Sequence, residues 1–150
     1  MKRYLTKNNI ITLALMTFVT IRLLPQFLIN FKEEGQILPS ESLSTFRNVE
    51  VRLPDPDQRT LIIFWASWCG PCKIEMARLQ NSIDSQKINP AQIFAINPFE
   101  DNAVIRKFIS ENKYQFHFVK DSSLAQKLQI QQTPTTILFD KNKITKISDG

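Results

Sequence analysis

The chain has 150 residues, 43% of them hydrophobic, enough to form the core of one domain with a short appendage. The net charge is +5, but four of the 19 basic side chains and none of the 14 acidic ones lie in residues 1–31. The rest of the chain is nearly neutral, which argues against a basic face for nucleic acid. The two cysteines, only three positions apart, exclude a disulfide framework and a four-cysteine zinc site.

The first 31 residues combine basic side chains with an apolar stretch. Lys2, Arg3 and Lys7 precede the uncharged residues 10–21. No small-residue cleavage site follows, which favours an uncleaved signal anchor over a cleaved signal peptide with an atypical site. We therefore expect residues 1–31 to form a single-pass anchor in the inner or cytoplasmic membrane. The positive charges would then stay inside, and the rest of the chain would face the periplasm or another extracytoplasmic space.

The remainder of the chain is expected to be a linker followed by an α/β domain. Residues 32–44 are polar, with Pro39 and several serines, and predict a linker. The hydrophobic periodicity of the residues that follow predicts strands over 46–53, 60–66, 92–97, 116–119, 135–139 and 144–147, and helices over 71–86, 101–112 and 122–129. This order predicts a domain over residues 45–150, with a mixed central β-sheet flanked by helices.

The spacing of apolar residues also predicts which side chains are buried. On the first helix the expected inward face is Cys72, Met76, Leu79 and Ile83; on the second it is Val104, Ile105, Phe108 and Ile109. The phenylalanine-rich stretch from Phe94 to Phe99 is expected in the core, and Ser122 or Ser123 is expected to cap the third helix.

The two cysteines lie directly after the predicted strand 60–66 and open a predicted helix. A helix N-terminus has unpaired N–H groups and favours negative charge, so the thiolate of Cys69 should be stabilised there. A thiolate is the nucleophile of disulfide exchange, and the spacing lets Cys72 reach Cys69. Pro71 is tolerated in a first helical turn, and Gly70 has no side chain that would obstruct a substrate.

The cysteine pair does not by itself make a zinc site. Zinc would require two further ligands, and the chain has no other cysteine and only His117. Trp68 would supply a flat apolar wall beside the active sulfur. The pair therefore favours redox chemistry, with no metal and no cofactor beyond a redox-active disulfide between Cys69 and Cys72.

The run Trp68-Cys69-Gly70-Pro71-Cys72 resembles the active site of the thioredoxin superfamily. More narrowly, residues 45–150 resemble the membrane-anchored TlpA/ResA/DsbE-like branch. Two further motifs match: a glutamate three residues after the second cysteine, and a cis-proline loop before a strand. The resemblance implies a nucleophile, a resolving thiol and a proton-exchanging carboxyl at Cys69, Cys72 and Glu75. The substrate contacts that it implies are Trp68, Gly70, Pro71, Thr133 and Pro134.

Three departures from thioredoxin itself have consequences. Ile63 occupies the place of a buried aspartate, which favours a proton-exchange role for Glu75, and Ala77 occupies that of a helix-kinking proline. The chain stops at Asp149-Gly150, where the family's last helix would begin. We therefore expect the C-terminal helix to be absent or truncated.

The resemblance implies an extracytoplasmic thiol–disulfide oxidoreductase that reduces disulfides in partner proteins. One example substrate is the cysteine pair of apocytochrome c before haem attachment. A membrane electron donor of the thiol–disulfide type would renew the reduced enzyme. Two alternatives remain open: a disulfide-forming oxidase, and a non-enzymatic module that binds copper or a partner through the two thiolates.

Overall fold

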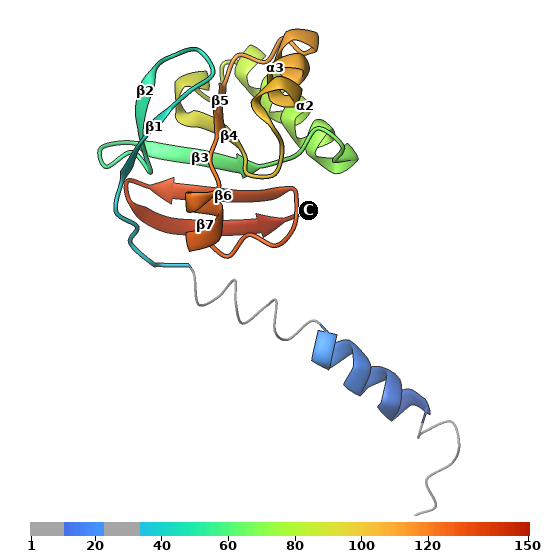
Figure 1. Cartoon of the computed structure of the whole chain (residues 1–150). Coiled ribbons are helices and arrows are strands. Elements are labelled where there is room, and N and C mark those ends of the chain that lie inside the picture. The colour runs from blue at the N-terminus through green and yellow to red at the C-terminus, as the bar shows by residue number, and fades with distance from the viewer. Residues whose placement is uncertain (1–10, 23–33) are drawn as a thin grey trace, which may run out of the picture. The chain divides into compact units, whose positions relative to one another are not determined.

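The computed structural model describes residues 11–22 and 34–150 (Figure 1). The contacts between residues divide the chain into two units, and the folded unit is Gly35–Gly150. The folded unit contains every strand that the structure describes and both cysteines.

The predicted single-pass membrane anchor is wrong. Residues 11–22 are helical. Within residues 11–22 and 34–150, no helix is long and apolar enough to cross a membrane. The predicted single-pass membrane location rested on that anchor and is corrected with it. Residues 1–10 and 23–31 of the predicted segment lie outside the described residues.

A five-stranded mixed sheet forms the centre of the folded unit (Figure 1). Its strands are β3 Arg59–Phe64, β4 Ile93–Asn97, β5 His117–Lys120, β6 Thr135–Asp140 and β7 Lys143–Asp149, in the order β5-β4-β3-β6-β7. The pairs β3–β4 and β4–β5 are parallel, whereas β3–β6 and β6–β7 are antiparallel. The predicted α/β class with a mixed central sheet is confirmed.

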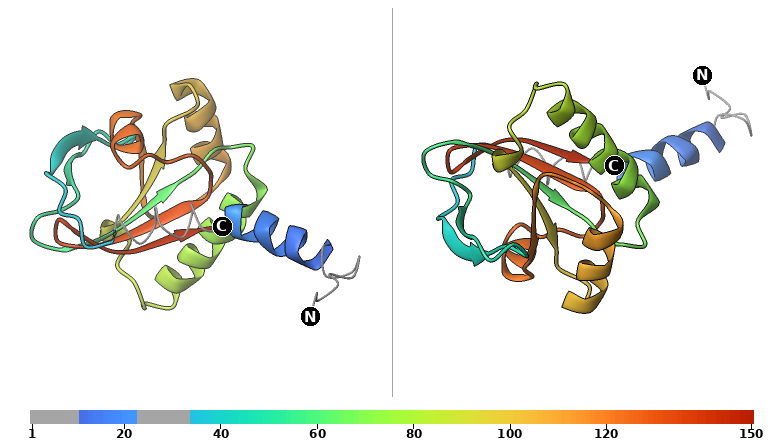
Figure 2. Two further views of the ribbon diagram at one scale, coloured as in Figure 1. Left: turned by 90° about the horizontal axis from the view of Figure 1, so that it is seen from below. Right: turned by 90° about the horizontal axis from the view of Figure 1, so that it is seen from above.

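Three α-helices and one short 3₁₀ turn connect these strands: α2 Gly70–Asp84, η1 Pro90–Gln92, α3 Asn102–Glu111 and α4 Ser123–Lys127. Figure 2 shows α2 against one side of the sheet and α4 against the other. Side chains alternate along β3, so Ile63 belongs to a core cluster with Met76 of α2 and Phe108 of α3, and Ile62 to a second cluster with Leu124 of α4. The sheet is thus covered on both faces, as its apolar central strands require.

The part of the predicted linker that the structure describes includes a β-strand. β1 Glu41–Ser44 pairs antiparallel with β2 Glu50–Leu53. The predicted strand 46–53 begins only at Glu50, because residues 45–49 form the turn between the two strands. There the buried Thr45 hydroxyl accepts the N–H groups of Arg47 and Val49, at 3.3 and 3.2 Å.

One predicted detail of the helices is wrong, and another is confirmed in position but not in its hydrogen bond. Val104 is 42% exposed, because α3 buries the stripe of Ile105 and Phe108, and successive helical residues are about 100° apart. Ser122 is the N-cap residue of α4, as predicted, but its side chain makes no capping hydrogen bond. Instead the Asp121 carboxylate accepts the backbone N–H of Leu124 at 2.7 Å. It thereby satisfies one of the N–H groups in the first turn of α4 that have no partner within the helix.

Candidate active site

The two cysteines form a disulfide at the N-terminus of α2. Cys69 is the N-cap residue, and its sulfur accepts the backbone N–H of Cys72 at 3.1 Å. Pro71 lies in the first turn, where no backbone donor is needed. The Cys69 sulfur therefore faces the end of the helix that favours negative charge, as a thiolate nucleophile requires.

The two sulfurs differ in their access to solvent. Cys72 is fully buried in the core cluster of α2, while Cys69 keeps 4% of its surface exposed. The neighbours of Cys69 are open: Trp68 is 70% exposed, and a side chain at Gly70 would meet no atom within 4 Å. An incoming substrate can therefore approach Cys69 more easily than Cys72.

The predicted proline loop lies across a groove from α2. The Thr133–Pro134 bond is cis, and Pro134 lines the same groove as Pro71, Ile74 and Glu75. Strands β6 and β7 form the other wall of this groove with Thr136, Leu138, Lys146 and Ser148. The structure thus brings together two of the predicted substrate contacts, Pro71 and Pro134, from distant parts of the chain.

Glu75 is in this groove, one turn into α2 from Cys72. Its side chain is 32% exposed, and its carboxylate pairs with Arg78 at 3.4 Å. The partial burial predicted for Glu75 is therefore present, and an arginine partner accompanies it.

Sequence reasoning missed a second loop, which follows β4. Glu100 in this loop accepts hydrogen bonds from the backbone N–H of Ser67 at 2.6 Å and from the Ser67 hydroxyl. The buried Asn97 donates its side-chain N–H to Glu100 at 2.6 Å and accepts the backbone N–H groups of Phe99 and Glu100 at 3.0 Å. These residues, the Glu100 network (Ser67, Asn97 and Glu100), join the β4 loop to the segment just before Cys69.

The sequence held one signal for this contact. Strands β3 and β4 are adjacent and parallel, so the loops after them meet at the same edge of the sheet, where ligands commonly bind. The prediction that Phe99 lies in the core is wrong, because its side chain is 51% exposed. Its ring lies 6.4 Å from the ring of Trp68, centroid to centroid.

The Glu100 network affects the ionisation of its carboxyl. Burial acts to raise the pKa of Glu100, but the hydrogen bonds from Ser67 and Asn97 outweigh it and hold the pKa below its ordinary value of 4.5. The network therefore contains a carboxylate at neutral pH, which strengthens each bond that it accepts.

Stability should consequently depend on Glu100 in a pH-dependent way. A carboxyl with a lowered pKa in the folded state contributes stability above its ordinary value of 4.5 and loses it as the pH falls through the folded-state pKa. We expect Glu100→Gln to lower the free energy of unfolding at about pH 7, and the difference from the unsubstituted protein to shrink towards about pH 3. Urea unfolding at both pH values measures this; a difference that is the same at both would contradict it.

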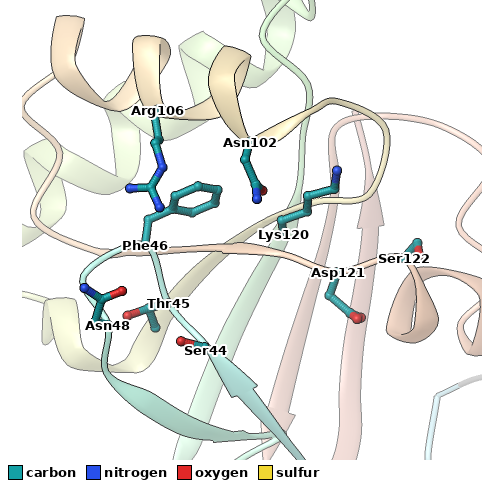
Figure 3. A pocket seen from close by; sticks show the side chains of 9 residues that line it. All are labelled: Ser44, Thr45, Phe46, Asn48, Asn102, Arg106, Lys120, Asp121 and Ser122. Atoms are coloured by element: carbon teal, nitrogen blue, oxygen red, sulfur yellow. The ribbon is translucent and has the colours of Figure 1, made fainter.

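A separate polar pocket of about 400 Å³ lies between the β1–β2 turn, α3 and the loop after β5 (Figure 3). Neither cysteine lines it. Its two cations already have partners: the Arg106 guanidinium lies 5.1 Å from the centre of the Phe46 ring, and Lys120 pairs with Asp101 at 3.8 Å. Within residues 11–22 and 34–150, no group of three or more His, Cys, Asp or Glu side chains could hold a metal ion.

Comparison with known proteins connects this geometry to a family. Residues 35–147 match the AhpC/TSA family. The chain is 31% identical over 114 residues to sporulation thiol-disulfide oxidoreductase A of Bacillus subtilis (strain 168), covering 72% of this chain and 69% of the relative. It is 30% identical over 120 residues to thiol-disulfide oxidoreductase ResA of Geobacillus thermodenitrificans (strain NG80-2), covering 77% and 69%.

Solved structures agree with the sequence matches. The crystal structure of StoA from Bacillus subtilis superposes with a TM-score of 0.67 at 29% identity, covering 75% of this chain and 88% of that one. A DsbE from Chlorobium tepidum, described as a thiol:disulfide interchange protein, gives 0.64 at 24% identity, covering 78% and 85%, and supports the fold alone. The chain therefore belongs to the AhpC/TSA family and, within the thioredoxin superfamily, to its TlpA/ResA-like thiol–disulfide oxidoreductases.

Proposed function

We propose that this thiol–disulfide oxidoreductase works as a reductase of disulfides in other proteins. The observation that carries the proposal is the Cys69–Cys72 disulfide at the N-terminus of α2, with the Cys69 sulfur accepting the N–H of Cys72 at 3.1 Å. The same donor and the helix dipole would stabilise a Cys69 thiolate. The proposal requires no metal, and no cofactor beyond this disulfide.

The reaction begins from the reduced pair. The Cys69 thiolate attacks one sulfur of a substrate disulfide, forms a mixed disulfide and expels the other substrate sulfur as a thiolate, which takes up a proton. Cys72 gives its thiol proton to the Glu75 carboxylate and then attacks the Cys69 sulfur from within α2, which releases the second substrate sulfur as a thiolate. Two electrons have then passed to the substrate, and the Cys69–Cys72 disulfide has formed.

The family resemblance supports a substrate class and an electron source. We propose proteins with accessible disulfides as substrates, the cysteine pair of apocytochrome c among them. A dithiol of a membrane electron donor would return the Cys69–Cys72 disulfide to its reduced form by the same exchange. Trp68, Gly70, Pro71, Thr133 and Pro134 are the residues that we propose to contact the substrate.

The direction of electron flow can be tested by the reduction potential of the pair. The full chain would be equilibrated in graded thiol–disulfide buffers, and the free thiols trapped and counted. A potential near about −270 mV, like that of thioredoxin, would support a reductase, whereas one near about −120 mV would indicate an oxidase. If no Cys69–Cys72 disulfide formed at any buffer ratio, redox function itself would be refuted, and a thiolate-binding module would become the better account.

Glu75 gives a second test of this mechanism. We expect Glu75→Gln to slow the resolving attack of Cys72 by about tenfold, because an amide cannot accept the proton of the Cys72 thiol. This is less than the roughly 10²–10⁴-fold typical of general acid–base groups, because the Glu75 carboxylate is partly exposed and shared with Arg78. The decay of the mixed disulfide at neutral pH measures it, with Glu111→Gln on α3 as a matched control. Decay as fast as in the unsubstituted protein would exclude the proposed role.

A further inference from the structure

Trp68, the chain neighbour of Cys69, and Phe99 form a pair of large apolar side chains that lie exposed. Trp68 is 70% exposed and Phe99 is 51% exposed, and their ring centroids are 6.4 Å apart. They come from two different loops, after β3 and after β4. Exposing two adjacent aromatic rings is unfavourable in water, so a contiguous pair of this kind commonly marks a contact surface.

The Glu100 network holds the backbone next to both rings in place. Ser67, directly before Trp68, donates two hydrogen bonds to the Glu100 carboxylate, and Phe99 directly precedes Glu100. Asn97 is fully buried, and its side-chain oxygen accepts the backbone N–H of Phe99 at 3.0 Å. This bond fixes the backbone of Phe99 itself. The two loops are therefore joined by polar bonds immediately next to the exposed rings.

We infer that Glu100 is a positioning residue that holds Trp68 and Phe99 together as an apolar surface for the substrate segment around the disulfide. This inference rests on the proposed exchange at Cys69. Any substrate sulfur must come within bonding distance of the Cys69 sulfur, about 2.05 Å in the mixed disulfide. The residues flanking the substrate cysteine must then pass close to Trp68, the chain neighbour of Cys69. The occupant of this surface is therefore a disulfide-bearing polypeptide with apolar side chains beside its cysteine.

The inference can be tested with two peptide disulfides in single-turnover reductions by the fully reduced full chain. In one peptide the cysteine is flanked by leucines, and in the other by glycines. We expect the unsubstituted protein to reduce the leucine peptide about tenfold faster, and Phe99→Ala to bring the two rate constants within about twofold. Ile37→Ala removes another exposed apolar side chain, 75% exposed, as a matched control and should keep the tenfold preference.

Glu100 variants separate positioning from contact. Glu100→Ala keeps Phe99 but removes the acceptor of three hydrogen bonds, and we expect it to lose the preference as Phe99→Ala does. Glu100→Gln can still accept the N–H groups of Ser67 and Asn97 through its amide oxygen, and we expect it to retain most of the preference. The glutamine variant also makes the test independent of any folding defect in the alanine variant.

Two results would overturn the inference: equal rates for both peptides in the unsubstituted protein, or a preference that survives both Phe99→Ala and Glu100→Ala. A preference lost in Phe99→Ala but kept in Glu100→Ala would refute the positioning role of Glu100. The rate ratio does not depend on the reduction potential, because excess peptide drives each single turnover. An oxidising potential would therefore refute the proposed reductase direction and leave this ratio intact.

Discussion

Replacing Cys69 by serine is expected to lower the rate of disulfide exchange by roughly 10³-fold or more, because a neutral hydroxyl replaces the thiolate nucleophile. Replacing Cys72 is expected to have a different effect. Cys69 can still attack a substrate, but no second sulfur releases the product, so the mixed disulfide should accumulate. The asymmetry follows from the structure, in which Cys69 caps α2 and Cys72 is fully buried behind it.

The choice of replacement matters at these two positions. Serine is a good N-cap residue, so Cys69→Ser should preserve α2. A serine at Cys72 would bury a hydroxyl among apolar side chains, and Cys72→Ala avoids that cost. Mass spectrometry of non-reduced samples, taken after mixing each reduced variant with a peptide disulfide, measures the adduct. Accumulation with Cys69→Ser, and none with Cys72→Ala, would reverse the assigned roles.

The sheet and the cysteine site were accessible from the sequence because their signals are local. The continuous apolar run before Trp65 predicts a buried strand, and β3 lies there. The spacing of Cys72, Met76, Leu79 and Ile83 predicts one helical face, and all four are buried on α2. Each of these features depends on neighbours within about three helical turns or one strand, which a sequence displays directly.

Two of the errors, at β1 and at Phe99, have a different cause, since each depends on a contact between residues that are distant in the sequence. β1 was expected as linker because its polar sequence gains its order from pairing with β2 and from the ion pair between Glu41 and Lys127 of α4. Phe99 was expected in the core because composition alone cannot show that Glu100 is bonded to Ser67, 33 positions earlier. The anchor was expected from the basic and apolar composition of residues 1–31, whereas no helix within residues 11–22 and 34–150 is long and apolar enough to cross a membrane.

The two tryptophans near the site lie three positions apart. Replacing them should lower the free energy of unfolding by very different amounts. Trp65 is fully buried, with its ring 4.4 Å from that of Phe108 and 5.5 Å from that of Phe118. We expect Trp65→Ala to lower the free energy of unfolding by about 3–5 kcal/mol, the range for a large aromatic side chain removed from a core. Trp68 is largely exposed, and we expect Trp68→Ala to change that free energy by no more than about 0.5–1 kcal/mol.

Urea unfolding of the oxidised proteins measures both changes, and Trp65→Phe refines the first. No residue among 11–22 and 34–150 accepts a hydrogen bond from the buried indole N–H of Trp65. Phenylalanine keeps the ring contacts and removes this donor, so Trp65→Phe should lose less than half of what alanine loses. The backbone N–H of Trp65 also bonds to the carbonyl of Ile96 at 3.1 Å, next to the start of the β4 loop. Equal costs for Trp65→Ala and Trp68→Ala would show that the loop, and not the core beneath it, sets the stability of this site.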